Sequence, residues 1–345
     1  METTMKCIIK KHAGQGNLEY TTKPIPKIGD TDILVKIKAT AICGTDVHIE
    51  DWNTWAEKRV SPPVIIGHEF SGEVIEIGKN VASIKVGDVV SAETHVVCNS
   101  CELCRNNFQH VCYNTSTIGV HRDGCFAEYI AIPEENAVVF DSSIPFEILS
   151  MMEPLGVAVH AAMEFPIASK IVAIVGCGPI GAMAIAVAKK IGASKIIAIE
   201  PNPERASLAL KMGADIFVNP LQEEPIQKIK SLTNNHGVDV VLEFSGHVSA
   251  LKAAFSYCKP EAKIAAVGLA SKPIDFDISE FVYRGLTLKG IAGRLMYITW
   301  EQIKGLMASG LDISPIITHV LPLESYEKGL HLMRDGKCGK VILKP

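Results

Sequence analysis

The sequence has no block of lysine or arginine residues, and its 34 basic residues are slightly outnumbered by 38 acidic ones. The formal net charge of -4 gives no electrostatic footprint for nucleic acid or an anionic membrane, and we expect neither as a partner. Internal repeats and low-complexity tracts are also absent. The first ten residues lack the apolar core and small-residue pattern of a signal peptide, so we expect a cytoplasmic protein.

Charged residues are missing from residues 171–188, a stretch whose length approaches that of a membrane-spanning helix. Three glycines and Pro179 interrupt it, however, so a strand, a tight turn and a helix explain it better. With 48% hydrophobic residues, the chain has ample material for packed cores, which excludes disorder. Its 345 residues are typical of two domains rather than one.

Cysteine, in contrast, is abundant, with ten residues in a chain expected in a reducing compartment where disulfides are disfavoured. Clustered cysteines are therefore interpreted first as metal ligands. Four of the ten cluster between residues 98 and 112, and Cys43 belongs to a separate group considered below. We interpret the other five as small buried hydrophobic residues: Cys7, Cys125, Cys177, Cys258 and Cys338.

The four clustered cysteines have the spacing of a structural zinc site. Two residues separate each of Cys98, Cys101 and Cys104, and Cys112 follows. Four thiolates enclose one zinc ion tetrahedrally and leave no open coordination position. Bacterial ferredoxins use a similar run, but their fourth cysteine follows after three residues and precedes proline, whereas here seven residues intervene and Tyr113 follows. We therefore predict a zinc lobe over about residues 95–115.

The two halves of the chain differ in their pattern of secondary structure. Up to about residue 150, short runs rich in Val, Ile, Thr and Gly predict a mostly antiparallel β domain, with strands at 33–40, 64–66, 72–77 and 88–91. Strands at 171–175, 196–200, 239–244 and 264–268 then alternate with helices at 180–191, 203–212 and 248–258. This alternation indicates a doubly wound parallel sheet. Helices at 299–309 and 323–334 and a strand at 340–343 are predicted to follow.

Gly176, Gly178 and Gly181 form a GxGxxG motif between a predicted strand and helix, which is the context of a dinucleotide-binding turn. The glycines allow a tight turn, close approach of a pyrophosphate, and close packing of helix on strand. Glu200 ends the next strand, where a carboxylate accepts hydrogen bonds from both ribose hydroxyls and repels a 2′-phosphate. We therefore predict NAD rather than NADP. Arg205 either weakens this preference, stacks beside the adenine or pairs with Glu200.

Four dispersed residues are candidate ligands of a second, catalytic zinc: Cys43, His68, Glu69 and Glu153. The first three end apolar strands, and Glu153 stands just before an apolar helix. A catalytic zinc needs about three protein ligands and one exchangeable position, and a Cys, His and carboxylate set leaves the ion a good Lewis acid. Spacing leaves open whether Glu69 or Glu153 is the resting third ligand. Thr45 and His48 follow Cys43 closely and could relay a proton from substrate to water.

In combination these motifs resemble the zinc-containing medium-chain dehydrogenase/reductase family. The order of Cys43-Gly-Thr45-Asp-x-His48, Gly67-His68-Glu69, the cysteine lobe and the GxGxxG motif covers essentially the whole chain. The resemblance implies a GroES-like catalytic domain of residues 1–150 and 295–345, a Rossmann NAD-binding domain of residues 151–294, two zinc ions per chain, and homotetramers. It also implies zinc-dependent oxidation of a secondary alcohol, with Thr45 and His48 carrying the proton away and NAD accepting the hydride.

Further segments resemble the threonine dehydrogenases of this family, notably residues 45–49, 290–294, 314–319 and 333–341. By this resemblance Cys43, His68 and Glu69 bind the catalytic zinc, and Glu153 tunes or joins that site. Contacts with NAD are implied for Gly176, Gly178, Ile180, Gly181, Glu200, Arg205, Val267, Gly268, Leu269, Ile291 and Ala292. A threonine pocket would pair the substrate carboxylate with His95 or Arg294, and its ammonium with Glu93 or Glu153, because an unpaired buried charge is costly.

One position departs from the threonine dehydrogenases, which usually carry Asn where this chain has Val157. Polyol and butanediol dehydrogenases carry a small apolar residue there. A polyol or 2,3-butanediol is therefore the alternative to L-threonine as substrate. A catalytically silent zinc- and nucleotide-binding scaffold is a further alternative, but such a protein needs neither a complete set of open-site ligands nor a proton relay.

Overall fold

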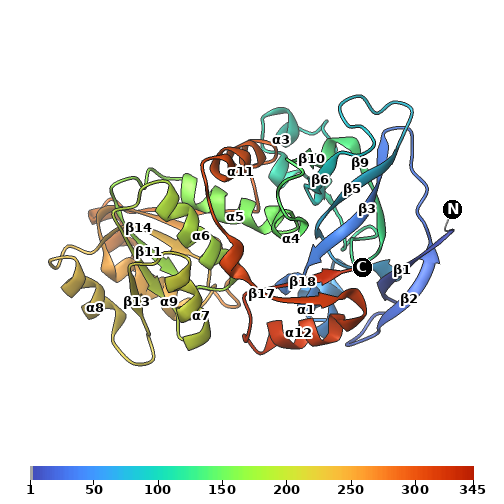
Figure 1. The fold of residues 1–345 in the computed structure, drawn as a ribbon. Helices are drawn as coiled ribbons and strands as arrows, with labels where there is room; N and C mark the ends of the chain where they lie inside the picture. Colours follow the sequence, from blue (N-terminus) through green and yellow to red (C-terminus); the bar gives the residue numbers. More distant parts are fainter. Residues whose placement is uncertain (1–2) are drawn as a thin grey trace. The chain divides into compact units, whose positions relative to one another are not determined.

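The computed structural model describes residues 3–345 and divides into two compact units. Unit 1 comprises Met1–Pro154 and Ile317–Pro345, and unit 2 comprises Leu155–Ile316. The chain therefore leaves unit 1, forms the whole of unit 2 and then returns, as its colours show in Figure 1. The predicted return at residues 294/295 lies instead at 316/317, because helix α11 (Ile298–Ala308) and the turn after it pack within unit 2. Lys190 in that unit donates a hydrogen bond to the Ser309 carbonyl.

Unit 1 is mainly antiparallel β structure. Its largest sheet has the strand order β10-β6-β5-β3-β18-β17, with β9 also paired to β3. Two smaller sheets have the orders β2-β1-β4 and β7-β8. The strands are β1 (Thr4–Lys10), β2 (Leu18–Pro24), β3 (Asp32–Ala41), β4 (Val64–Ile65), β5 (Glu69–Ile77), β6 (Val89–Ala92), β7 (His95–Val96), β8 (Ser116–Thr117), β9 (Tyr129–Pro133), β10 (Ala137–Val139), β17 (Ile317–Pro322) and β18 (Lys340–Lys344).

Alternating side chains of β3 supply two hydrophobic cores of unit 1. Ile33, Val35 and Ile37 pack into the larger core, whereas Leu34 faces a smaller one that contains Met5. Successive residues of a strand point to opposite faces, so a strand that is apolar on both faces is buried between two layers. This burial fixes the register of β3 against its neighbouring strands. The register in turn determines the position of the residues that directly follow β3, including Cys43.

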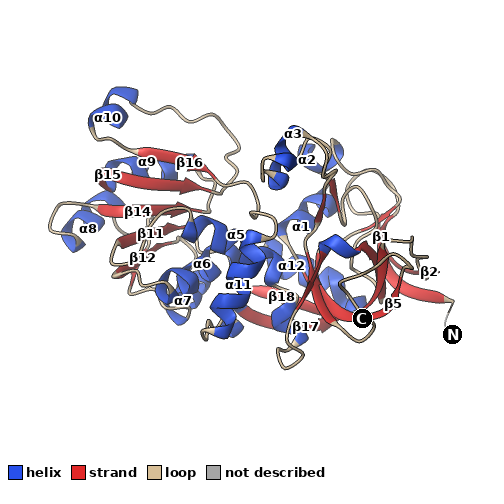
Figure 2. Cartoon of the chain, turned by 90° about the horizontal axis from the view of Figure 1, so that it is seen from above, coloured by secondary structure: helices blue, strands red, loops and turns tan. Residues whose placement is uncertain are grey.

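Unit 2 contains a six-stranded sheet with the order β13-β12-β11-β14-β15-β16, in which all neighbours are parallel. This is the doubly wound order predicted from the alternating pattern. Figure 2 shows these strands side by side, from β16 at one edge toward β12. The strands are β11 (Ile171–Val175), β12 (Lys195–Ile199), β13 (Ile216–Val218), β14 (Val238–Glu243), β15 (Cys258–Ala266) and β16 (Thr287–Gly290).

Helices connect the parallel strands of unit 2. Because crossovers between parallel strands are right-handed as a rule, we expect the helices before and after the switch between β11 and β14 to lie on opposite faces of the sheet. The helices are α6 (Pro179–Lys190), α7 (Pro203–Lys211), α8 (Pro225–Leu232), α9 (Val248–Tyr257) and α10 (Ile278–Tyr283). Helix α5 (Met152–Met163) precedes the sheet and includes Glu153 in its first turn, so the prediction that Glu153 stands before this helix is wrong by one turn. Within residues 3–345, no helix has the length and apolar character that crossing a bilayer requires.

Candidate zinc and dinucleotide sites

Strand register assembles the open metal site in unit 1. Ala41, the last residue of β3, pairs with Glu69 in β5 and with Ile342 in β18. Cys43 therefore follows the end of β3 at the same edge where His68 precedes β5. The ligand atoms of Cys43, His68 and Glu69 lie within 4.8 Å of one another. A thiol, an imidazole and a carboxylate at this separation are suited to an open zinc site.

The surroundings of these three side chains fit a bound cation. Glu69 is completely buried, and its Oε1 has no hydrogen-bond partner among the described residues. Asp46, also completely buried, accepts a hydrogen bond from the Cys43 backbone N–H (2.9 Å), and its Oδ1 lies 3.9 Å from His68 Nδ1. At this distance the two atoms share no hydrogen bond, so Asp46 places a negative charge behind the imidazole without fixing its tautomer. The sequence argument gave Asp46 no role, although it lies within the quoted Cys43–His48 motif.

Lys340 is the second residue of this site that the sequence argument missed. Its ammonium is buried, donates to the Ile42 carbonyl (2.9 Å) and forms an ion pair with Glu69 Oε2. Burial raises the pKa of Glu69 well above its ordinary value, and the positive charge of Lys340 opposes that rise. Lys340 therefore holds one carboxylate oxygen of Glu69, which leaves Oε1 for a metal.

Glu153 lies beside the three-residue group rather than within it. It is 8% exposed, and Thr94 Oγ1 lies 3.3 Å from its Oε1. The pKa of the Cys43 thiol is raised, mainly by burial and in part by the negative charges of Asp46 and Glu153. Of the two carboxylates that the sequence left open, Glu69 thus shares the cluster with Cys43 and His68, and Glu153 forms a neighbouring negative charge.

The two candidate relay residues lie on helix α1 (Gly44–Asp51), for which Cys43 is the N-cap. Thr45 is half-buried, with its Oγ1 3.7 Å from Cys43 Sγ. His48 follows three residues later, about one turn along the helix, and is exposed. The Thr45 hydroxyl therefore lies beside the metal ligands, and the His48 imidazole is exposed to solvent. A relay that carries a proton from the site to water needs this arrangement.

The candidate substrate residues lie in both units. In unit 1, Glu93 is completely buried, and its Oε1 accepts a hydrogen bond from the His95 N–H (2.9 Å) and lies 3.6 Å from His95 Nδ1. Glu93 thus orients His95. Thr94, between them, contacts Glu153, so this segment borders the metal site. In unit 2, Arg294 is 2% exposed and packs on Gly156, where an added Cβ would lie 2.5 Å from Arg294 Cδ.

The four-cysteine lobe forms a closed metal site. The Sγ atoms of Cys98 and Cys112 are 3.5 Å apart, and Cys101 Sγ lies 3.5 Å from Cys104 and 3.8 Å from Cys112. Backbone and side-chain hydrogen bonds from Ser100 lower the pKa of Cys98 to about 5, whereas burial raises the pKa of Cys104 to about 12, so without a metal the thiolate is favoured at Cys98 and not at Cys104. The lobe is held by a two-stranded sheet and by helix α3 (Glu102–Arg105), which begins directly after Cys101.

The glycine-rich turn and Glu200 border a cavity of about 570 Å³ in unit 2. Gly176 has a φ of 83°, and a Cβ added to Gly181 would lie 2.0 Å from the Gly176 carbonyl oxygen. Glu200 accepts hydrogen bonds from the N–H groups of Cys177 (2.8 Å) and Asn202 (3.0 Å) at the end of β12. Arg205 also lines the cavity, and its Nε has no hydrogen-bond partner among the described residues. This space and these groups fit a dinucleotide.

The other predicted cofactor residues follow the carboxyl ends of neighbouring parallel strands, where ligands bind in this fold. Ile180 lies in the first turn of α6, residues 267–269 follow β15, and residues 291–292 follow β16. The sequence argument missed Glu243, the last residue of β14, whose carboxylate accepts from the N–H groups of Ser245 (2.8 Å) and Gly246 (3.1 Å). Glu243 thus shapes the loop beside Gly176.

Known protein families match both units. The pattern of the alcohol dehydrogenase GroES-like domain matches residues 29–142, and that of the zinc-binding dehydrogenases matches residues 179–309. The chain belongs to the zinc-binding dehydrogenase family. This membership confirms the prediction of a GroES-like domain combined with a Rossmann domain. It also confirms that the protein is an oxidoreductase enzyme, and thus not the silent scaffold.

Individual members of the family are similar over the full chain length. The L-threonine 3-dehydrogenase of Caldanaerobacter subterraneus subsp. tengcongensis is 50% identical over 348 residues, which cover 100% of both chains. A zinc-binding dehydrogenase structure from Sinorhizobium meliloti 1021, bound to NADP, is 26% identical with a TM-score of 0.93 and covers 100% of both chains. The 2R,3R-butanediol dehydrogenase from Bacillus subtilis is 27% identical, with a TM-score of 0.90 and 99% of each chain covered.

Proposed function

We propose that this zinc-binding dehydrogenase oxidises L-threonine to 2-amino-3-oxobutanoate with NAD as the hydride acceptor. The relative named L-threonine 3-dehydrogenase, which is 50% identical over its entire length, carries this proposal. The site in unit 1 supports it, because an acidic group, Glu153, and an imidazole, His95, border the metal cluster through Thr94. L-Threonine presents an ammonium and a carboxylate, and each needs an opposite partner when it is buried.

Each residue has a role in this proposal. Bound zinc would supply Lewis acidity toward the alcohol oxygen, and bound NAD would accept the hydride. Cys43, His68 and Glu69 hold the metal. Thr45 receives the alcohol proton and passes it to His48, which is exposed and releases it to water. Glu153 pairs with the substrate ammonium and tunes the metal site.

The substrate carboxylate is assigned to His95 in this proposal. Glu93 Oε1 accepts the backbone N–H of His95 and lies 3.6 Å from its Nδ1, so Glu93 holds His95 in position and places a negative charge beside its ring. Arg294 is the second candidate for the carboxylate. We propose Glu93 as a positioning residue for His95, because its carboxylate accepts the His95 backbone N–H, and Glu153 as the partner of the substrate ammonium.

The preference for NAD over NADP is assigned to Glu200. Its carboxylate lies at the end of β12, lines the dinucleotide cavity and is only 3% exposed. A negative group at this position accepts hydrogen bonds from the ribose hydroxyls and repels a 2′-phosphate. The structurally similar enzyme from Sinorhizobium meliloti was solved with NADP bound, so the shared fold alone does not select NAD. We therefore expect the choice between NAD and NADP to depend on the residues at the end of β12.

A neutral diol is the competing substrate. Val157, on helix α5, is half-buried and apolar, and the butanediol dehydrogenase of Bacillus subtilis has a similar fold. We therefore propose an assay of NAD reduction with L-threonine, D-threonine, 2,3-butanediol and sorbitol. We expect the highest kcat/KM with L-threonine. Strong activity with butanediol or sorbitol and none with L-threonine would overturn the assignment and identify Val157 as the decisive residue.

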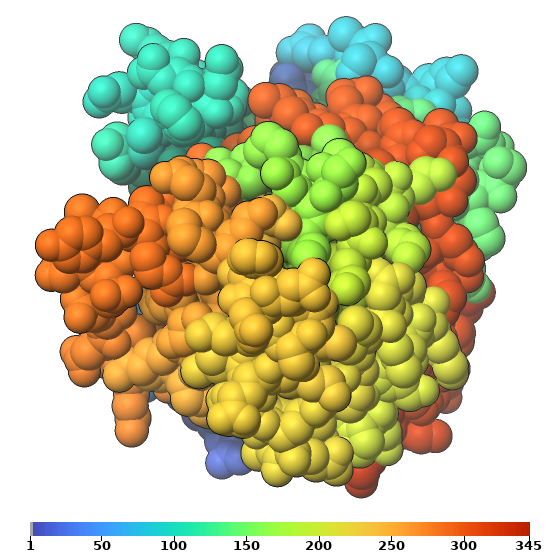
Figure 3. Space-filling model, turned by 90° about the vertical axis from the view of Figure 1, so that its left-hand side faces the viewer, coloured from blue at the N-terminus to red at the C-terminus, as the bar shows by residue number. Residues whose placement is uncertain are grey.

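We also propose that the enzyme is a homotetramer. Strand β16 ends the parallel sheet, and an open strand edge can pair with another chain. Beside it, α10 carries exposed apolar residues, including Ile278 (60%), Val282 (69%) and Tyr283 (87%). Figure 3 shows this orange segment at the left margin of the molecule. Contiguous exposed apolar surface is typical of protein interfaces.

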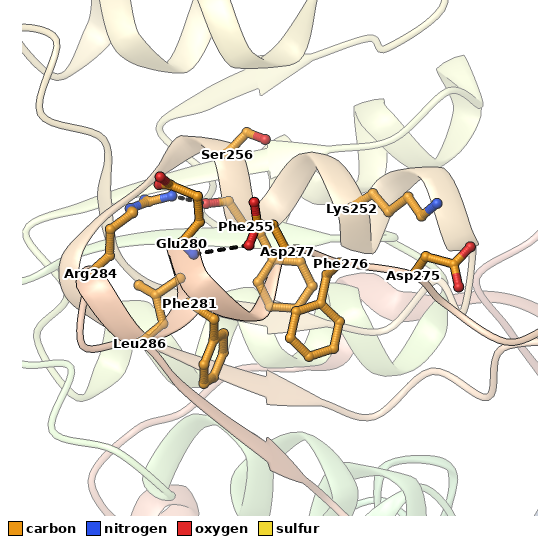
Figure 4. A pocket seen from close by; sticks show the side chains of 10 residues that line it. All are labelled: Lys252, Phe255, Ser256, Asp275, Phe276, Asp277, Glu280, Phe281, Arg284 and Leu286. Carbon is orange, nitrogen blue, oxygen red and sulfur yellow. Dashed lines mark hydrogen bonds between the residues drawn. The ribbon is translucent and has the colours of Figure 1, made fainter.

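A hollow of about 300 Å³ lies next to this surface and is lined in part by Phe255, Phe276 and Phe281, whose rings contact one another (Figure 4). Phe276 is itself 43% exposed. Light scattering of the unmodified protein and of Val282→Asp tests the proposal. We expect four chains per particle in the first and fewer in the second, and a monomeric unmodified protein would contradict it.

A further inference from the structure

Helix α5 carries a buried histidine that the proposed chemistry does not use. His160 is 4% exposed, and its Nδ1 lies 2.9 Å from the carbonyl oxygen of Gly293. Because a carbonyl oxygen only accepts, Nδ1 must carry the proton. Burial lowers the pKa of His160 below its ordinary value, so the neutral imidazole is favoured and its single N–H is directed at this carbonyl.

A second contact joins the same turn to Glu164, the residue directly after α5. Glu164, one turn beyond His160, has its Oε1 2.6 Å from Lys289 Nζ, and its Oε2 lies 3.8 Å from His160 Nε2. Lys289 belongs to β16, whose last residue, Gly290, begins the turn of residues 290–294. The turn is thus held at both ends, by His160 of α5 through the carbonyl of Gly293 and by Glu164, just beyond α5, through Lys289.

The turn needs such attachment because its own sequence is flexible. It contains two glycines, and Gly293 has a φ of 56°, a conformation that side chains disfavour. Ile291 and Ala292, between them, are proposed cofactor contacts. A loop that is already ordered before its ligand arrives loses less conformational entropy on binding, and therefore binds more tightly.

We propose that His160, supported by the Glu164–Lys289 ion pair, is a positioning residue that holds the 290–294 turn in its cofactor-binding conformation. The inference rests on the proposed function in one respect, namely that residues 291–292 contact NAD. His160 does not touch the reacting atoms in this proposal. It acts through the Gly293 carbonyl, and its effect is expected on cofactor affinity more than on the chemical step.

Two substitutions at this position separate the hydrogen bond from the volume of the ring. His160→Leu removes the donor, whereas His160→Asn keeps an N–H close to the position of Nδ1. Fluorescence titration should show NADH binding about five- to tenfold weaker in His160→Leu and within about twofold of the unmodified protein in His160→Asn. His12→Leu, at an exposed position in unit 1, is the matched control and should bind NADH normally.

Amide hydrogen exchange of residues 290–294 in the cofactor-free protein supplies a readout that is independent of activity. We expect faster exchange in His160→Leu and restored protection in His160→Asn. Unchanged NADH affinity and unchanged exchange in folded His160→Leu would overturn the proposal. If the unmodified protein bound no NADH at all, the proposed cofactor would be wrong, and exchange within the turn would decide the role of His160 by itself.

A second variant keeps the test decisive if His160→Leu does not fold. Lys289→Met removes the other attachment at a side chain that is 53% exposed, where folding is not at risk. We expect about two- to threefold weaker NADH binding and faster exchange at residue 290. Normal affinity and exchange in Lys289→Met would contradict the supporting role of the ion pair.

Discussion

Alanine substitutions at two glycines of the GxGxxG motif, Gly181 and Gly178, should affect different properties, the first stability and the second NADH affinity. A Cβ at Gly181 would lie 2.0 Å from the Gly176 carbonyl oxygen, a backbone atom that cannot move without distorting the turn. A Cβ at Gly178 would meet no atom within 4 Å, and its φ of -61° suits any residue. Gly181→Ala is therefore expected to destabilise unit 2, and Gly178→Ala to spare it.

The expected magnitudes follow from these contacts. Overpacking against a fixed backbone costs up to about 3 kcal/mol, and alanine in the helix returns about 1 kcal/mol, which leaves a net loss of about 2 kcal/mol for Gly181→Ala. For a domain the size of unit 2 this corresponds to a fall of roughly 4–8 °C in the melting temperature. In Gly178→Ala, a poorer N-cap costs about 0.5 kcal/mol, and the smaller entropy of the unfolded chain offsets it.

For Gly178→Ala, NADH affinity rather than stability should change. A methyl group at Gly178 projects where the backbone would approach a pyrophosphate, so we expect NADH affinity to fall at least about tenfold while the melting temperature changes by less than about 2 °C. Circular-dichroism melting and NADH fluorescence titration measure the two quantities on the same samples. Full NADH affinity in Gly178→Ala would refute the reasoning, because the cofactor would then not approach this turn.

Further predictions concern the metal sites and specificity. Cys104→Ser should lower the melting temperature and the zinc content by one ion per chain while kcat changes little, because a closed site contributes folding energy. In metal-free protein, Lys340→Met and Glu69→Gln should each lower the free energy of unfolding, measured in urea, by about 3–5 kcal/mol, because each leaves a buried charge unpaired. The double variant should lower it by clearly less than the sum of the two single effects. Glu200→Ala should narrow the ratio of kcat/KM for NAD over NADP, and equal use of both by the unmodified enzyme would contradict our interpretation of Glu200. His95→Ala should lower kcat/KM for L-threonine by about tenfold to a hundredfold and for 2,3-butanediol by less, and an equal loss for both substrates would argue against a carboxylate contact.

The features that the sequence predicted well are those encoded over short distances. The cysteine lobe and the glycine-rich turn are each contained within about fifteen residues, so spacing alone limits their geometry. Helix α8 shows a local signal that was overlooked. Glu224 caps it by accepting the Gln227 N–H (3.0 Å), and Pro225 occupies its first position, which is where proline is favoured.

Contacts between distant segments were beyond the sequence argument. Lys340 lies 271 residues from Glu69, and only the pairing of β18 with β3 brings the two together. The choice between Glu69 and Glu153 likewise depends on strand register and on where α5 begins. Glu93 or Glu153 was predicted to face the substrate ammonium, because an unpaired buried charge is costly. In the structure the Glu93 carboxylate accepts the backbone N–H of His95, while the side chain of Asn136 donates to the main-chain carbonyl of Glu93.

The late return of the chain to unit 1 has a consequence for biosynthesis. Strand β18 lies inside the largest sheet of unit 1, between β3 and β17, yet it is made after all of unit 2. Domains fold as they emerge from the ribosome, so the dinucleotide-binding unit can finish while the metal-binding unit still exposes the unpaired edge of β3. Lys340 also arrives only then, so the counter-ion of Glu69 is made after all of unit 2. The ion pair between Lys340 and Glu69 can therefore form only after unit 2 has been translated, whereas all four cysteines of the lobe precede unit 2 in the chain.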